Sequence, residues 1–301
     1  MRFSSTIGLF AITLASLALP ADAQPSHSAT ETAHQTSGYG SNRDASGTFR
    51  HDGVTFYYEV YGKGEPLVLI HGNGGSIADW ASQIGYFRTR YRVIAMDSRD
   101  QGRSGDSAGP ITYEKMADDQ AALLDHLGIA RAAVIGWSDG GIEALLLGMR
   151  HPSKVEKIVA MAANLKPDAV YPEVAQLDEV LTKQAEAAKV SSRQAARDKK
   201  VFSLLANEPH IDPKMLNSIT APTLVLAGDH DLILDTHTLE IFHNLPNAQL
   251  GIFPDSTHMV PYDDPERFND AVDRFLRHPF VKRDRIADFL KSLEKIRANQ
   301  K

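Results

Sequence analysis

Short apolar runs alternate along the chain with segments whose apolar residues recur at helical spacing. Nearly continuous apolar runs are typical of strands that are covered on both faces of a parallel sheet. The segments between them favour helices lying across such a sheet. The pattern predicts an α/β fold, a mostly parallel open sheet with helices on both faces. The predicted strands are 54–61, 67–71, 92–96, 132–137, 157–162, 223–228 and 249–253, and the predicted helices include 116–127, 142–149 and 266–276.

One long segment interrupts the alternation. Residues 164–219 contain no strand-like run, but they contain helix formers at 184–188 and 193–205. A crossover between parallel strands needs only about a dozen residues. We therefore expect a small helical lid insertion over the carboxyl edge of the sheet. An ordinary crossover is the alternative.

The amino-terminal residues lie outside this pattern. Residues 1–23 have a basic start, an apolar stretch at 7–19 and an Ala-x-Ala site ending at Ala23. This arrangement predicts a signal peptide, with a membrane anchor as the alternative. Residues 24–46 are polar and without periodicity, which indicates a flexible tether. We expect an exported protein, periplasmic or secreted.

The domain itself is expected at residues 47–280. Residues 281–301 form a basic amphipathic helix, for which packing on the domain's own surface is favoured over a dimer or membrane contact. The chain has 301 residues, of which 43% are apolar, so one large domain with a sizeable core fits. Its net charge of −6 gives no basic footprint for nucleic acid. We expect a small-molecule substrate, no nucleic acid partner, no membrane partner after signal cleavage, and a monomer or homodimer.

Chemistry-bearing motifs narrow the function. The chain has no cysteine, which excludes a disulfide framework and a thiol nucleophile. The pattern G-x-S-x-G occurs twice, around Ser107 and around Ser138. A nucleophile on this pattern needs a strand before it and a helix after it. Only Ser138 has both, because Ser107 lies in a loop that ends at Pro110. The context predicts Ser138 as the nucleophile.

A serine hydroxyl needs a neighbouring base and a group that orients the base, and in this topology their order is serine, acid, histidine. His258 follows the last predicted strand and is the expected base, with His278 as the weaker rival. Asp231, three residues beyond Gly228, is the preferred acid. Asp229 and Asp168 are the alternatives for that role.

An acyl-transfer site also needs two N–H donors for the oxyanion. One is expected from Asp139, directly after the nucleophile, and the other from the loop at 71–75. Asn73 is the preferred donor of that loop and Gly74 the runner-up, whereas His71 is expected to be structural. His230 lies between two aspartates without a further ligand, so we expect no metal and no cofactor.

Together these motifs resemble the α/β-hydrolase superfamily over residues 48–277. The resemblance rests on HGNGG at 71–75, DSRDQGRS at 97–104, GWSDGG at 136–141, GDHD at 228–231 and His258. Asp100 departs from the family pattern, which commonly has glycine there, and so leaves the local turn geometry open.

The elbow is similar to that of valacyclovir-hydrolase-like serine esterases, in which the aspartate next to the nucleophile binds the ammonium group of α-amino acid esters. The resemblance implies that Asp139 is a possible substrate-binding residue, and Gly74 of the loop at 71–75 is the second possible substrate-binding residue. The alternative is that Asp139 supplies only its N–H and an acidic cap for the following helix.

The residues favour a serine hydrolase that cleaves a carboxylic ester through an acyl-enzyme. Hydrolysis of a C–C, lactone or amide bond by the same residues is the alternative. An epoxide hydrolase or haloalkane dehalogenase is disfavoured, because those families have aspartate where this elbow has Ser138. A non-catalytic ligand-binding member of the superfamily is a remote alternative.

Overall fold

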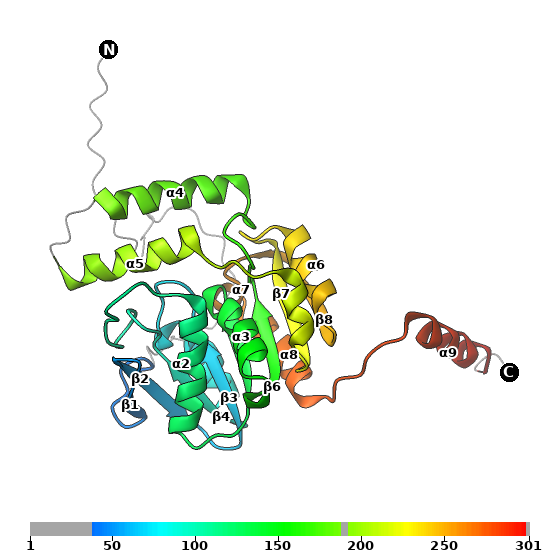
Figure 1. Ribbon diagram of the computed structural model, residues 1–301. Helices are drawn as coiled ribbons and strands as arrows, with labels where there is room; N and C mark the ends of the chain where they lie inside the picture. Colours follow the sequence, from blue (N-terminus) through cyan, green and yellow to red (C-terminus); the bar gives the residue numbers. More distant parts are fainter. Residues whose placement is uncertain (1–37, 188–191, 299–301) are drawn as a thin grey trace, which may run out of the picture. The chain divides into compact units, whose positions relative to one another are not determined.

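The computed structural model describes residues 38–187 and 192–298. Its centre is an eight-stranded sheet with strand order β1-β2-β4-β3-β5-β6-β7-β8 (Figure 1). The first two strands pair antiparallel with each other, and β2 is antiparallel to β4, whereas the remaining neighbours are parallel. This sheet confirms the predicted fold class. The strands are β1 (Ser46–His51), β2 (Val54–Tyr61), β3 (Glu65–Ile70), β4 (Tyr91–Met96), β5 (Ala132–Trp137), β6 (Val155–Met161), β7 (Thr223–His230) and β8 (Ala248–Thr257).

Helices cover both faces of the sheet, and each face has its own apolar core (Figure 1). Leu123 of α2, Leu145 of α3 and Ile241 of α6 belong to one core. Ile84 of α1 and Phe268 of α8 belong to the other. The bounds are α1 (Ala81–Phe87), α2 (Tyr113–His126), α3 (Asp139–Arg150), α6 (Asp235–Asn244), α7 (Val260–Asp263) and α8 (Pro265–Arg277), with 3-10 turns η1 (Ile77–Trp80), η2 (Pro152–Lys154) and η3 (Pro213–Ser218).

Strand β3 shows why its sequence is apolar without interruption. Successive side chains of a strand point to opposite faces of the sheet. Val68 and Ile70 accordingly join the core under α2 and α3, and Leu67 and Leu69 join the core under α1 and α8. Each is at most 1% exposed, and burial of such a side chain contributes about 1.5–3 kcal/mol.

The long segment between β6 and β7 forms two helices, α4 (Pro172–Ala187) and α5 (Arg193–Asn207), followed by η3. Helix α5 begins at an N-cap, where the Ser192 hydroxyl accepts from the Ala195 N–H. It contacts the loops that follow β3 and β4, because Asn73 donates to the Val201 carbonyl and Lys200 donates to Asp100. We call residues 164–219 the lid, since α5 lies at the carboxyl edge of the parallel strands.

The described part of the expected tether, residues 38–46, lies against the sheet. The Glu59 carboxylate is fully buried and accepts from the N–H groups of Gly40 and Asn42, both at 2.8 Å. The ring of Tyr39 meets that of Tyr61 at a centroid distance of 4.9 Å. A buried carboxylate needs such donors, which explains why this polar stretch is ordered here. The predicted signal peptide and residues 24–37 lie outside the described residues.

Helix α9 (Arg285–Ala298) has no buried residue. Its apolar side chains are exposed, with Ile286 at 68% and Phe289 at 59%, and the packing of this face on the domain stays a prediction. Over the described ranges, none of the helices is both long and apolar enough to cross a bilayer.

Candidate active site

Ser138 occupies the sharp turn between β5 and α3. Its φ of 57° and ψ of −121° are a strained backbone conformation for a residue with a side chain. The two glycines of the motif allow this turn. A Cβ on Gly136 would lie 1.9 Å from the Gly140 carbonyl oxygen, and a Cβ on Gly140 would lie 2.0 Å from that of Ile70. The strand and helix can therefore approach closely only because both positions lack a side chain.

Asp231 and His258 meet beside the carboxyl ends of β7 and β8. His258 Nδ1 lies 2.7 Å from Asp231 Oδ1, and both residues are less than 10% exposed. The Asp231 carboxylate also accepts from the N–H groups of Gly228 and Ile233, each at 3.2 Å. These bonds fix the carboxylate. A carboxylate at Nδ1 favours the tautomer that leaves Nε2 free to accept a proton.

A second contact ties the histidine loop to the elbow. Trp137, immediately before Ser138, donates its indole N–H to the His258 carbonyl at 2.9 Å. The two rings have a centroid distance of 6.1 Å. Over residues 38–187 and 192–298, the Ser138 hydroxyl forms no protein hydrogen bond. Serine–histidine contacts are often long without substrate.

The loop after β3 runs next to the elbow. A Cβ on Gly72 would be 3.3 Å from Ser138 Cβ. Within the described chain, the N–H groups of Asn73 and Asp139 donate to no protein acceptor. The Gly74 N–H differs, because it donates to Gln101 Oε1 at 2.6 Å. Asn73 and Asp139 therefore offer the two unused donors.

His71 is built into the fold. It is 1% exposed, its Nε2 accepts from the Ser98 N–H at 3.0 Å, and its Nδ1 lies 2.8 Å from the Gly72 carbonyl oxygen. Both ring nitrogens are thus used by the backbone, in line with the structural role expected for this residue.

The Asp139 carboxylate points into the protein. It is 2% exposed and accepts from Asn73 Nδ2 at 2.8 Å. Burial raises the pKa of Asp139, while the Asn73 amide and the Tyr113 hydroxyl beside it act in the opposite direction. Any cationic substrate would have to compete with these internal partners.

The alternative acids lie elsewhere. Asp229 is exposed and accepts from the N–H groups of Asp255 and Ser256, both at 3.0 Å, and these bonds lower its pKa. Asp168 forms an ion pair with Lys166 at 3.6 Å. Neither contacts His258. The rival base His278 is exposed, and its carbonyl accepts from Lys157 at 2.9 Å.

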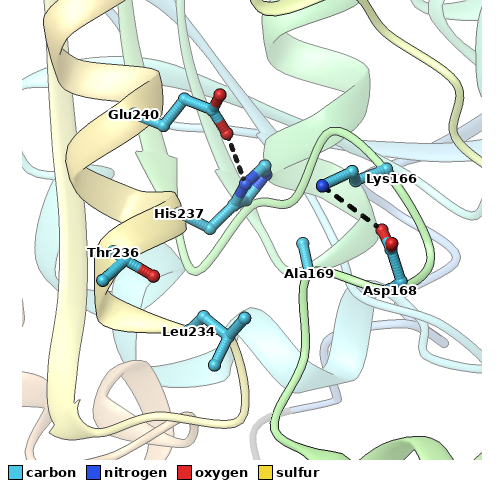
Figure 2. A pocket seen from close by; sticks show the side chains of 7 residues that line it. All are labelled: Lys166, Asp168, Ala169, Leu234, Thr236, His237 and Glu240. Carbon is cyan, nitrogen blue, oxygen red and sulfur yellow. Dashed lines mark ion pairs between the residues drawn. The ribbon is translucent and has the colours of Figure 1, made fainter.

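Asp168 borders a pocket of about 350 Å³ between the start of the lid and α6 (Figure 2). His237 is buried in its wall, where Nε2 accepts from the Leu165 N–H at 3.0 Å and Nδ1 lies 2.9 Å from Glu240. Burial lowers the pKa of His237, which favours the neutral ring that this contact needs. The Leu165–His237 hydrogen bond thus connects the start of the lid to α6. Neither Ser138 nor His258 lines this pocket.

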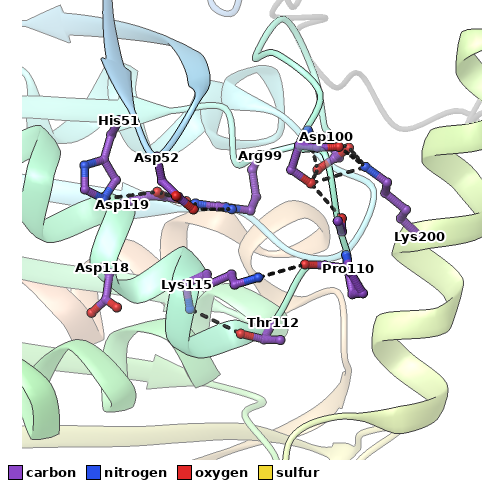
Figure 3. Close-up of polar contacts among 12 residues, drawn as sticks. His51, Asp52, Arg99, Asp100, Pro110, Thr112, Lys115, Asp118, Asp119 and Lys200 are labelled. Atoms are coloured by element: carbon purple, nitrogen blue, oxygen red, sulfur yellow. Dashed lines mark hydrogen bonds and ion pairs between the residues drawn. The ribbon is translucent and has the colours of Figure 1, made fainter.

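The loop after β4 joins the second serine motif to the lid. Asp100 adopts the left-handed conformation, with φ of 61°, where the family commonly has glycine. Its buried carboxylate accepts from the Ser107 hydroxyl at 2.5 Å and from Lys200 of α5 at 2.7 Å (Figure 3). Aspartate tolerates this conformation better than most residues. Ser107 is therefore a loop serine whose hydroxyl is already bonded.

Three residues of this site were absent from the sequence-based set of functional candidates. Tyr113 lies beside the Asp139 carboxylate, Gln101 binds the Gly74 N–H, and Lys200 reaches Asp100 from the lid. Only Gln101 carried a local signal, as part of the motif at 97–104. Among the described residues, no three His, Asp or Glu side chains are grouped as a metal site requires.

A parallel sheet with a strained serine elbow at its carboxyl edge defines the α/β hydrolases. Residues 65–205 match the model of the alpha/beta hydrolase fold family. The chain has the α/β-hydrolase fold and is similar to that family over residues 65–205, and the comparisons support a hydrolase enzyme in general terms.

Several relatives match most of the domain. "Putative carbamate hydrolase RutD" of Caulobacter sp. (strain K31) is 28% identical, over 73% of this chain and 95% of the relative. 3-oxoadipate enol-lactonase 2 of Acinetobacter baylyi is 26% identical, over 74% and 94%. The solved structure of Est816, an N-acyl homoserine lactone degrading enzyme, is 28% identical with a TM-score of 0.63, covering 76% of this chain and all of that one.

Proposed function

We propose that this protein is a serine hydrolase that cleaves a carboxylic ester through an acyl-enzyme. The observation that carries the proposal is the Asp231–His258 contact of 2.7 Å, tied to the elbow through the Trp137–His258 hydrogen bond. An imidazole that a carboxylate orients, on a loop bonded to the serine elbow, supports the activation of the Ser138 hydroxyl at neutral pH.

In this mechanism Ser138 Oγ attacks the ester carbonyl carbon while His258 Nε2 takes its proton. The negative charge on the carbonyl oxygen is held by the N–H groups of Asn73 and Asp139. His258 then protonates the departing alkoxide, which leaves an acyl group on Ser138. Water, activated by the same imidazole, releases the acid. Asp231 orients the ring and stabilises its positive charge.

A labelling experiment tests the nucleophile. A fluorophosphonate probe should modify the wild-type protein at Ser138, and Ser138→Ala should lose the label. The matched control is Ser107→Ala, in the second copy of the motif, which should be labelled like the wild type because its hydroxyl is bonded to Asp100. Labelling that persists in Ser138→Ala would contradict the assignment.

Lactone hydrolysis is the second candidate. It uses the same residues, and two relatives named for lactone chemistry match the chain at 26% and 28% identity. In a lactone the leaving alkoxide stays attached to the acyl group. Comparing kcat/KM for acyl esters and for lactones of matched acyl length would separate the two.

A further inference from the structure

The side chain of Asn73 joins three elements. Its Nδ2 donates to Asp139 Oδ2 at 2.8 Å and to the Val201 carbonyl of α5 at 3.2 Å. Asn73 itself follows β3, Asp139 begins α3, and Val201 belongs to the lid. One amide thus connects the oxyanion loop, the elbow and the lid.

The Asp139 carboxylate is placed to hold this amide rather than to face solvent. It is 2% exposed, and Tyr113, which lies beside it, is 1% exposed. The Asn73 amide and the Tyr113 hydroxyl both donate to the Asp139 carboxylate. Asp139 also lies in the first turn of α3, where a negative charge is favourable. Its position is therefore fixed from several sides.

The backbone of Asn73 lies in a turn that is held on its far side, where the Gly74 N–H donates to Gln101 at 2.6 Å and the Gly75 N–H donates to the Gly72 carbonyl at 3.1 Å. The Asn73 N–H donates to no acceptor in the described chain, and the next residue, Gly74, is exposed with φ of 69°. The bonds of the Asn73 side chain hold this turn from the elbow and from the lid, and so help to set the direction of the Asn73 N–H. Precise placement matters, because a shift of about 1 Å at a catalytic group can cost about 100-fold in rate.

We propose that the Asp139 carboxylate is a positioning group that acts through the Asn73 side chain to aim the Asn73 N–H at the oxyanion, with lid helix α5 as the second anchor. The inference rests on the proposed serine mechanism. It assigns the Asp139 side chain a role separate from that of its own N–H.

The lid anchor is itself fixed close to Val201. Its neighbour Lys200 donates to Asp100 at 2.7 Å, and Arg197, one turn earlier, donates to Asp106 at 2.5 Å and to the Gly102 carbonyl at 2.9 Å. Helix α5 is thus held at the point where it receives the Asn73 hydrogen bond. The Asn73 side chain therefore keeps both of its hydrogen-bond acceptors only while α5 is in this position.

The test compares Asp139→Ala, Asp139→Asn, Asn73→Ala and the double alanine variant, using 4-nitrophenyl acetate and alanine 4-nitrophenyl ester. Asp139→Ala and Asn73→Ala should each lower kcat about 10- to 100-fold on both substrates, with KM within about 3-fold. The double variant should lose no more than the worse single one, since both break one contact. Asp139→Asn, which keeps an acceptor oxygen, should recover most of the activity.

Two results would overturn the inference. One is an unchanged kcat in Asp139→Ala and Asn73→Ala. The other is a rise in KM confined to the aminoacyl ester, which would make Asp139 a cation-binding residue. If Asp139→Ala does not fold, Asn73→Ala, in a half-buried loop position, still decides. Fluorophosphonate labelling keeps the two ideas apart: an unlabelled wild type removes the serine mechanism and this inference together, whereas normal labelling with unchanged variant kinetics removes only the inference.

Discussion

At the scale of single residues, Glu143 is the least expected group in the core. It is fully buried on α3, where Gln120 Nε2 donates to its Oε2 at 3.3 Å. The other oxygen of Glu143 and the oxygen of Gln120 have no hydrogen-bond partner among the described residues. Burial raises the pKa of Glu143 well above its ordinary value. A protonated Glu143 has an O–H to donate, so we infer that it is neutral in the folded protein.

Because the folded protein keeps this proton, its stability should fall as the pH rises. Above the ordinary glutamate pKa of about 4.3, the unfolded chain releases a proton that the folded chain keeps, so folding is weakened by up to about 1.4 kcal/mol per pH unit. Glu143→Gln removes this dependence. The free energy of unfolding of the variant relative to the wild type, from urea denaturation, should therefore be higher at pH 8 than at pH 5. An equal difference at both pH values would show that Glu143 does not titrate as inferred.

At the scale of elements, charged side chains of α5 connect the lid to the loop after β4. Asp100 is 1% exposed in its side chain and pairs with Lys200, which is 26% exposed. The Asp106 carboxylate accepts hydrogen bonds from Arg193 Nε at 2.6 Å and from Arg197 Nε at 2.5 Å. The pair to Asp100 matters most, because an unpaired carboxylate is costly only where it is buried.

Two neighbouring lysines allow a matched test of this connection. Lys200→Met should destabilise the protein by about 1–3 kcal/mol, because it leaves the buried Asp100 without its cation. Lys199→Met, at an exposed position of the same helix, should change stability by less than about 0.5 kcal/mol. Urea denaturation gives both values, and hydrogen exchange should quicken in α5 of the first variant alone. Equal effects of the two substitutions would mean that the pair contributes nothing specific.

Helices and strands with a clear pattern of apolar residues could be predicted from the sequence. Elements that depend on tertiary contacts could not. The apolar run 132–137 corresponds to β5 without a shift. In contrast, β8 continues to Thr257, beyond the predicted 253, through polar residues whose N–H groups bind Asp229. Strand β1 has no apolar run and is ordered by pairing with β2.

The site follows the same rule. The order of Ser138, Asp231 and His258 along the chain could be read from the motifs, because each follows a strand. The direction of the Asp139 side chain could not, since it depends on Asn73 and Tyr113, which are distant in sequence.

At the scale of the whole molecule, export remains a proposal that rests on residues 1–23. If the signal is cleaved after Ala23, the mature protein should begin at Gln24. Intact mass and amino-terminal sequencing of the protein expressed with its native start, together with cell fractionation, would check this. A full-length protein recovered from the cytoplasm would contradict it.

The Trp137–His258 hydrogen bond spans 121 positions of the chain. Synthesis from the ribosome therefore delivers the proposed nucleophile Ser138 long before the proposed base His258, which follows β8, the last strand of the sheet. Under the proposed mechanism, a nascent chain or a fragment that ends before residue 258 carries the serine elbow without its proton acceptor. Hydrolytic activity should thus switch on only when the sheet is complete, which makes activity a direct reporter of finished folding.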